Sequence, residues 1–112
     1  MDCIFCRIAC GEIPTDFAYH DDEIVAFKDI NPLAPVHLIV IPREHIVSPA
    51  HMTGEHAGLM ARMVAVANRL AAEAGVSEKG YRLVANSGPD AGQEVPHLHL
   101  HVIGGRSLGA LG

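Results

Sequence analysis

Apolar residues fall into short blocks along the chain, and the spacing within a block distinguishes a strand from a helix. Ile24 to Lys28 and His37 to Ile41 are apolar, rich in β-branched residues and bracketed by turn-forming residues, which predicts two strands. Tyr81 to Ala85 and His97 to Ile103 have the same character in the second half of the chain. The blocks therefore predict strands in both halves of the sequence.

Between these two groups of strands, the spacing changes to a helical period. From Glu55 to Ala74 apolar residues recur every three or four positions, and Gly75 follows as a stop signal. Residues Asp2 to Ala9 predict a shorter helix, with Asp2 as its N-cap and Gly11 beyond its end. Strands, one long helix and further strands are typical of an α+β fold, in which a mainly antiparallel sheet carries the helix on one face.

The long predicted helix has more apolar surface than a single core contact needs. Its core stripe consists of Leu59, Met63, Val66 and Leu70. The stripe is widened by Met60, Val64 and Ala67. Because a broad apolar surface on a soluble protein needs cover, we expect this helix to contribute to a symmetric homodimer.

Composition agrees with one folded domain. The chain has 112 residues, of which 49% are hydrophobic and 19% charged, and neither a linker nor a repeat divides it. We therefore expect a single domain over residues 1–112. The formal charge of −5 comes from 13 acidic and 8 basic residues without a basic cluster, which argues against a partner that is a nucleic acid or a membrane surface.

The N-terminal segment does not have the pattern of a secretion signal. It lacks a basic region followed by an apolar core, and no apolar run in the sequence approaches the ~20 residues of a membrane span. We therefore expect a cytoplasmic protein that binds neither membranes nor nucleic acid.

Near the C-terminus, the run His-Leu-His-Leu-His-Val-Ile alternates imidazole and aliphatic side chains. In a strand, residues two apart share a face, so Leu98, Leu100 and Val102 would enter the core and three imidazoles would share the opposite face. Neighbouring imidazoles and partial burial both disfavour protonation, so we expect at least one neutral ring near pH 7. A neutral imidazole is a competent nucleophile. The alternatives are a metal site and three solvent-exposed histidines.

A turn-rich loop, Asn86 to Glu94, precedes the histidine run. Gly88 and Gly92 permit backbone conformations in which N–H groups converge on an anion. Glycine turns are common without a ligand, so the loop alone is weak evidence. Beside the histidine run, however, it would bring phosphate-binding donors next to a candidate nucleophile.

The cysteines indicate a second candidate chemistry. Their number, three, is odd for a disulfide scaffold, and Cys3 and Cys6 form a Cys-x-x-Cys pair. Such a pair can supply half of a tetrahedral zinc site. Two alternatives stay open, namely free cysteines that pack as small apolar groups and a redox pair. Cys10 has no evident partner and is expected to pack in the core.

The ordered combination of motifs resembles the histidine triad family, whose signature is His-φ-His-φ-His-φ with φ apolar. Here that signature is His97 to Val102, followed by Gly104-Gly105-Arg106. The similarity covers nearly the whole chain, through Cys3 to Cys6, Gly11 to Pro14, Ala26 to Ile30, Ala34-Pro35, His37 to Pro42, His45-Ile46, Gly80 to Arg82, Asn86 and Gly92-Gln93. The chain is most similar to the Hint branch, the histidine triad nucleotide-binding proteins. This resemblance implies a HIT-like five-stranded sheet with one long helix and a short N-terminal helix.

The resemblance also implies a reaction. A purine nucleoside phosphoramidate, or a related AMP derivative such as an aminoacyl adenylate, would be hydrolysed at its P–N or P–O bond through a nucleotidyl-histidine intermediate on His99. His101 would contact the phosphate oxygens and His37 would support that contact, and no catalytic metal would be required. Asp29 would accept hydrogen bonds from the ribose hydroxyls. The resemblance assigns the base pocket to Phe5, Ile8, Ile13, Phe27 and Ile30. It assigns the surroundings of the phosphate to Asn86, Gly92, Gln93 and Val95.

Position 94 departs from many Hint-like sequences, which have a hydroxyl residue there. Glu94 lies among the expected nucleotide-binding residues, and its carboxylate would either bind a cationic leaving group, such as a lysine amine, or point to solvent. The resemblance further implies a homodimer. It also implies a structural zinc ion, since relatives with the same cysteine pair place the metal on the positions that match Cys3, Cys6, His45 and His97.

Three alternatives to a phosphoramidate hydrolase remain at the level of sequence. One is a dinucleoside polyphosphate hydrolase, as in the fragile-histidine-triad branch, and another is a non-catalytic nucleotide-binding module. The third is a zinc-handling protein that uses the cysteine pair and all three histidines of the run. That third alternative leaves Asp29 and Gly92 unexplained.

Overall fold

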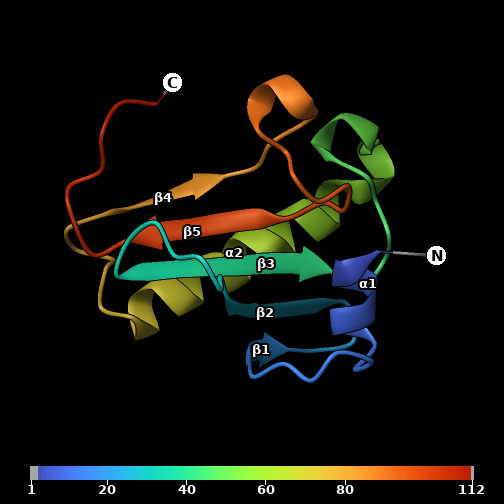
Figure 1. The fold of residues 1–112 in the computed structure, drawn as a ribbon, viewed down its shortest axis with the longest axis horizontal. Helices are drawn as coiled ribbons and strands as arrows, with labels where there is room; N and C mark the ends of the chain where they lie inside the picture. The colour runs from blue at the N-terminus through green and yellow to red at the C-terminus, as the bar shows by residue number, and fades with distance from the viewer. Residues whose placement is uncertain (1–2, 112) are drawn as a thin grey trace.

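The computed structural model describes residues 3–111, and within that range the chain forms a five-stranded antiparallel sheet with a helix on each face (Figure 1). The strands, in the spatial order β1-β2-β3-β5-β4, are β1 (Phe17–His20), β2 (Ile24–Lys28), β3 (Val36–Pro42), β4 (Tyr81–Val84) and β5 (Leu100–Gly104). The α-helices are α1 (Ile4–Ala9) and α2 (Ala57–Glu73). The predicted α+β class is confirmed.

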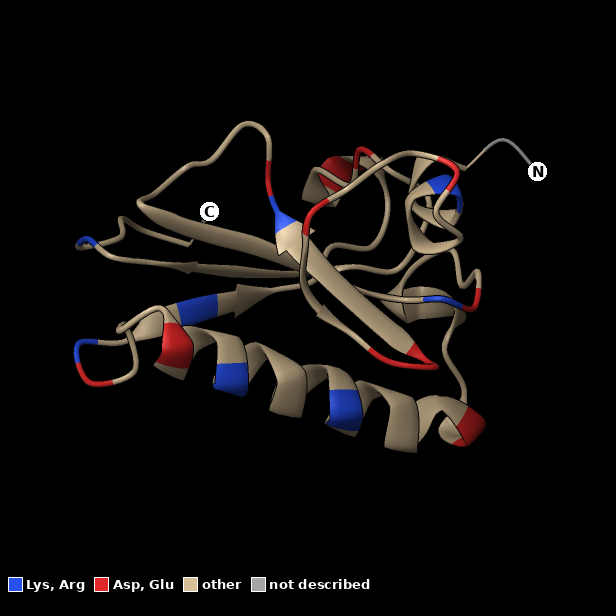
Figure 2. Ribbon diagram, turned by 90° about the horizontal axis from the view of Figure 1, so that it is seen from below, with Lys and Arg blue, Asp and Glu red and all other residues tan. Residues whose placement is uncertain are grey.

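The sheet separates two apolar clusters. On one face, Met63, Ala67 and Leu70 of α2 pack into the main core with the aliphatic residues of the histidine run. On the other face, Phe5 and Ile8 of α1 pack in a smaller cluster. Figure 2 shows α2 as a layer of its own below the sheet. Neither α-helix in the described residues is long and apolar enough to cross a membrane.

Local hydrogen bonds and backbone geometry explain where several elements begin and end. Asp21 closes the turn between β1 and β2, because its carboxylate accepts hydrogen bonds from the N–H groups of Glu23 and Ile24 at 2.7 and 2.8 Å. Gly75 has a φ of 79° and follows the end of α2, as predicted. The short strand β1 was not predicted by the apolar pattern, since its four residues alternate between half-buried and exposed.

Two predicted boundaries are wrong. Helix α1 begins at Ile4 with Cys3 as its N-cap, because the Cys3 sulfur accepts a hydrogen bond from the N–H of Cys6. Asp2, the predicted N-cap, lies outside the described residues. Strand β5 begins at Leu100, three residues later than predicted, because the N–H of Leu98 donates to the carbonyl of Ile46 in a loop and not to a strand.

The apolar breadth of α2 is explained by the fold of one chain. Leu59, Met63 and Ala67 are buried in the core, and Met60 and Val64 are half-buried against it. The apolar surface that α2 leaves for a second chain is therefore narrower than the sequence indicated. The homodimer stays a prediction.

Candidate active site and candidate metal centre

The histidine run meets β3 on the α1 side of the sheet. The rings of His99 and His101 have centroids 4.9 Å apart, and Phe5 of α1 lies edge-on to His99 at 5.2 Å. His37 of β3 adds a third imidazole, with its Nε2 2.9 Å from Nδ1 of His101. His97, His37 and His99 are buried. The alternative of three solvent-exposed histidines is therefore wrong.

A backbone carbonyl determines which nitrogen of His99 carries the proton. Nδ1 of His99 lies 2.7 Å from the carbonyl oxygen of His97. Because a carbonyl oxygen only accepts hydrogen bonds, Nδ1 is the protonated nitrogen, and Nε2 of the neutral ring keeps its lone pair. The main chain thus holds His99 in the tautomer that a nucleophile requires.

A backbone N–H determines the opposite tautomer in His37 and, through it, in His101, where the proton lies on Nε2 instead of Nδ1. The N–H of Leu33 donates to Nδ1 of His37 at 3.1 Å, so the neutral His37 ring carries its proton on Nε2. That Nε2–H donates to Nδ1 of His101 at 2.9 Å, which leaves the proton of His101 on its own Nε2. His101 therefore offers a hydrogen-bond donor, whereas His99 offers a lone pair. This combination suits attack on phosphorus with stabilisation of the phosphate oxygens.

Burial lowers the pKa of two imidazoles of the run, His97 and His101. Burial, followed by the neighbouring rings of His99 and His37, lowers the pKa of His101 to about 4. Burial likewise lowers the pKa of His97, with smaller contributions from the rings of His45 and His99. At neutral pH His101 is therefore a neutral donor, in agreement with the expectation of at least one neutral ring.

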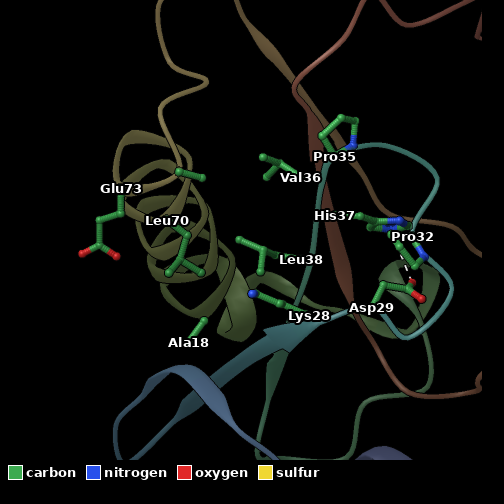
Figure 3. A pocket seen from close by; sticks show the side chains of 11 residues that line it. Ala18, Lys28, Asp29, Pro32, Pro35, Val36, His37, Leu38, Leu70 and Glu73 are labelled. Carbon is green, nitrogen blue, oxygen red and sulfur yellow. Dashed lines mark ion pairs between the residues drawn. The ribbon is translucent and has the colours of Figure 1, made fainter.

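Asp29 lies directly after β2, beside His37. Its Oδ2 atom is 3.4 Å from Nε2 of His37, as the dashed line in Figure 3 shows, and its Oδ1 atom accepts a hydrogen bond from the N–H of Asn31 at 2.8 Å. A cavity of about 460 Å³, between the β2–β3 loop and the C-terminal end of α2, is lined in part by Asp29 and His37. The Asp29 side chain remains 17% exposed, so a ligand hydroxyl can reach it.

Most residues expected in the base pocket lie in one apolar cluster. Phe5, Ile8 and Phe27 are buried in it, and Ile13 packs against it. The rings of Phe5 and Phe27 meet edge-on at 5.7 Å. Ile30 is 91% exposed and does not belong to the buried part of this cluster. An apolar wall thus adjoins the ring of His99.

In the glycine loop, the N–H groups of both glycines are engaged by the loop itself, and anion binding by the loop stays a prediction. The N–H of Gly88 donates to Oε1 of Gln93 at 2.8 Å, and the N–H of Gly92 donates to a carbonyl inside the loop at 3.0 Å. The side-chain amide of Gln93 also donates to the carbonyls of Val47 and Val95, at 2.7 and 3.0 Å. Both glycines have a φ of 87°, so they shape the loop that Gln93 then holds in place.

The next two residues have main-chain N–H groups without an intramolecular partner in the described part of the chain. Within residues 3–111, no hydrogen bond engages the N–H groups of Glu94 and Val95. The Glu94 side chain is exposed and lines a second cavity of about 500 Å³, while Val95 packs against the α1 cluster. Asn86 is half-buried, two residues beyond β4.

A second cluster joins α1 to the histidine run. Cys3, Cys6, His45 and His97 each contribute one donor atom, and these four atoms lie within 4.8 Å of one another. Sγ of Cys6 is 3.3 Å from Nδ1 of His45, and the Nδ1 atoms of His45 and His97 are 3.2 Å apart. A tetrahedral zinc site with bonds of about 2.0 to 2.3 Å has edges of about 3.3 to 3.8 Å. The donor set and its spacing therefore fit zinc.

The surroundings of the cluster support a metal as well. Nε2 of His97 donates to the carbonyl of Pro42 at 2.9 Å, which leaves the Nδ1 lone pair directed at the cluster. Burial and the neighbouring Cys3 raise the pKa of Cys6 to about 11, and a bound cation would favour the thiolate instead. Cys10, in contrast, is exposed, so the expectation that it packs in the core is wrong.

Two main-chain contributors to the site were not predicted. The N–H of Leu33 and the carbonyl of His97 orient His37 and His99, respectively. Every residue type has a backbone carbonyl and every type except proline has a backbone N–H, so these groups carry no signal in a sequence.

Several known proteins are similar to this chain in both sequence and fold. A sequence model of one family, described as HIT domain, matches residues 10–108. The chain is 44% identical over 108 residues to the purine nucleoside phosphoramidase of Escherichia coli strain K12. The aligned region covers 96% of this chain and 91% of that protein. A HIT family hydrolase from Legionella pneumophila Philadelphia 1 is 46% identical, with a TM-score of 0.93 over 95% of each chain. A histidine triad protein from Clostridium difficile is 42% identical, with a TM-score of 0.95 over 100% of this chain and 97% of that one.

Proposed function

Because the chain belongs to the HIT domain family, we propose that it is a hydrolase that cleaves purine nucleoside phosphoramidates or related AMP derivatives. The observation that carries this proposal is the pairing of two rings in opposite tautomers. His99 keeps a lone pair on Nε2, and His101, with its centroid 4.9 Å away, carries a proton on Nε2. The name of the Escherichia coli relative supports the substrate class.

The proposed reaction has two steps. Nε2 of His99 attacks the α-phosphorus, the P–N bond to the amine breaks, and the departing nitrogen keeps the electron pair and takes a proton from water. Water then attacks the phosphorus of the nucleotidyl-histidine and loses a proton to the solvent, while the bond between phosphorus and Nε2 breaks. This step releases the nucleoside monophosphate and restores the neutral ring. Dividing the displacement in this way avoids activating water against the original leaving group. Both steps use side chains of the protein and water.

Each part of the nucleotide has a proposed partner. The phosphate oxygens would be stabilised by the N–H groups of Glu94 and Val95 and by the Nε2–H of His101. His37 would support His101 through their hydrogen bond. Asp29 would accept hydrogen bonds from the ribose hydroxyls. The base would lie against Phe5, Ile8, Ile13 and Phe27, with the exposed Ile30 free to contact it. The phosphate environment would be completed by Asn86, Gly92 and Gln93.

We also propose that Cys3, Cys6, His45 and His97 bind a structural zinc ion. Four protein ligands complete a tetrahedral shell and leave no position for substrate. When bound, the ion would supply a cross-link between α1 and the histidine run. It would not act on the nucleotide.

The cellular setting proposed for the protein is a cytoplasmic homodimer without nucleic-acid or membrane partners. Cys3, Cys6 and Cys10 are free, which suits a reducing compartment. Figure 2 shows Lys and Arg dispersed among Asp and Glu along the elements, which argues against an anionic polymer as a partner. The half-buried Met60 and Val64 of α2 would contribute to the dimer contact.

The proposed activity is tested by measuring kcat/KM for an adenosine phosphoramidate and for a diadenosine polyphosphate side by side. We expect the phosphoramidate to have the higher value. A higher value for the polyphosphate would place the protein among the dinucleoside polyphosphate hydrolases. Retained AMP binding with turnover of neither compound would indicate a non-catalytic binding module.

A further inference from the structure

We propose that Arg106 is a positioning residue for the catalytic histidines, acting through the main chain of Leu33 and the ring of His37. The inference rests on the proposed function, because it concerns the same histidine pair. Nη2 of Arg106 donates to the carbonyl of Leu33 at 2.8 Å, and the N–H of Leu33 donates to Nδ1 of His37 at 3.1 Å. Together with the hydrogen bond from Nε2 of His37 to Nδ1 of His101 at 2.9 Å, these two connect a surface arginine to the tautomer of His101.

The main chain at Leu33 depends on these hydrogen bonds for its position. The Leu33 side chain is 66% exposed, so core packing does not fix it. Two prolines, Pro32 and Pro35, occupy the same loop and have no N–H with which to anchor it. Figure 3 shows the loop passing from Asp29 by way of Pro32 and Pro35 back into β3 at His37. Leu33 is therefore held on one side by His37 and on the other by Arg106.

The chain after β5 is shaped to bring Arg106 to this loop. Gly105 has a φ of 94°, and a Cβ atom added there would lie 3.0 Å from Cβ of Pro35. A side chain at position 105 would therefore push the two segments apart. Nη1 of Arg106 donates to the carbonyl of Ser107 at 2.9 Å, so the guanidinium group is oriented by two carbonyl oxygens.

Loss of Arg106 would alter the protonation pattern of the pair of rings. If the Leu33 N–H no longer faces Nδ1 of His37, that nitrogen can carry the proton instead of Nε2. Nε2 of His37 would then present a lone pair to Nδ1 of His101, and His101 would move its own proton to Nδ1. The Nε2 atom of His101 would face the phosphate as a lone pair, which repels the phosphate oxygens.

The test compares Arg106→Ala and Arg106→Lys with Arg82→Ala in the full-length protein. Arg82 is a matched control, since its Nη2 atom also donates to a backbone carbonyl, that of Gly109, at 2.9 Å. We expect ¹⁵N NMR to show His37 protonated at Nε2 in the unsubstituted protein and in Arg82→Ala, and a mixture of tautomers in Arg106→Ala. We also expect Arg106→Ala to lower kcat for an adenosine phosphoramidate about tenfold to a hundredfold, with Arg106→Lys in between.

The proposal is overturned if Arg106→Ala keeps the tautomers of the unsubstituted protein, whatever its kcat, or if its kcat falls no further than that of Arg82→Ala. Arg106→Gln provides the same comparison if the alanine variant does not fold. Should the unsubstituted protein turn over no phosphoramidate, the proposed function fails. The NMR comparison would still decide whether Arg106 sets the tautomer of His37.

Discussion

The histidines of this protein obtain their chemical roles from the backbone groups that surround them. His97 and His99 each donate to a carbonyl oxygen, whereas His37 accepts from an N–H, so rings of the same type present different atoms to the site. Peptide groups are held by the fold, which preorganises the rings before a nucleotide binds. The conformation of two loops therefore matters as much to the proposed chemistry as the imidazoles themselves.

The lowered pKa of His101 predicts a loss of stability in acid. Its pKa is about 4 in the folded chain, against an ordinary value of 6.5, chiefly because of burial. Between these values the unfolded chain binds more protons than the folded chain, so the free energy of unfolding decreases as the pH falls from about 6.5 to about 4. We expect the Tm of His101→Gln to fall less than that of the unsubstituted protein over this range. Equal falls in Tm would contradict this prediction.

Glu94 offers a test of leaving-group recognition. Its carboxylate is exposed and lines the cavity of about 500 Å³ beside Gln93. Because an exposed carboxylate attracts a cation only modestly, we expect Glu94→Gln to lower kcat/KM severalfold for a phosphoramidate of a lysine-type amine and to leave a neutral alkylamine substrate unchanged. Asp90→Asn, in the same loop, is the control. Unchanged kcat/KM for both substrates would assign the Glu94 side chain to solvent, and an equal fall for both would contradict recognition of the cationic leaving group.

Elements with a continuous buried side could be predicted from the sequence. Strands β2 and β3 and helix α2 lie within one or two residues of their predicted bounds, because each buries an unbroken apolar face. Strand β1 lies at the edge of the sheet and has no such face. Strand β5 is shorter than its alternation predicts, because a loop carbonyl takes the hydrogen bond of Leu98.

The side chains that the sequence singled out converge, but the main-chain groups around them could not be predicted. Residues as distant as Cys3 and His97 direct donors to one place. The N–H groups of Gly88 and Gly92, for example, donate to Gln93 and to a carbonyl of the loop itself, which the sequence did not indicate. Which N–H remains free depends on the three-dimensional path of the loop, and the identity of the residue does not reveal it.

The proposed zinc ion would stabilise the junction between α1 and the histidine run. A metal that binds only the folded chain adds its binding energy to stability, so we expect a chelator to lower the Tm by several degrees. Cys3→Ser and Cys6→Ser should lower the Tm markedly and kcat only slightly. Cys10→Ser, at an exposed site, should change neither quantity. Metal analysis of protein purified without chelators is the direct check. Absence of zinc, with melting indifferent to added zinc, would count against the metal site.

The sheet divides the whole molecule into two sides: one face packs against α2 in the main core, and the other carries α1 and the histidine rings. The main core under α2 contains Leu98, Leu100 and Val102, whose neighbours in sequence are the histidines of the run. Because apolar and imidazole side chains alternate along this segment, its histidine rings are anchored to the main core of the protein. A shift of this segment by one residue would exchange the two sets of side chains, so the core also fixes the register of the site.

For the whole molecule, we predict a homodimer. We expect light scattering at micromolar concentration to give twice the 11.9 kDa mass of one chain. Met60 and Val64, half-buried on α2, are the apolar side chains proposed to meet the second chain. Because the structure buries the rest of the apolar stripe internally, a monomer mass would show that one chain covers its own apolar surface.

The central claim is that His99 becomes covalently attached to the nucleotide. The most direct measurement is mass spectrometry of the intact protein, quenched in alkali shortly after mixing with an adenosine phosphoramidate and then mapped by peptide. The predicted result is one adenylyl group on His99. In His99→Ala we predict no adduct and a kcat lower by several orders of magnitude, with the fold and much of the nucleotide affinity retained. An adduct on any other residue, or a His99→Ala variant with near-normal kcat, would contradict the account.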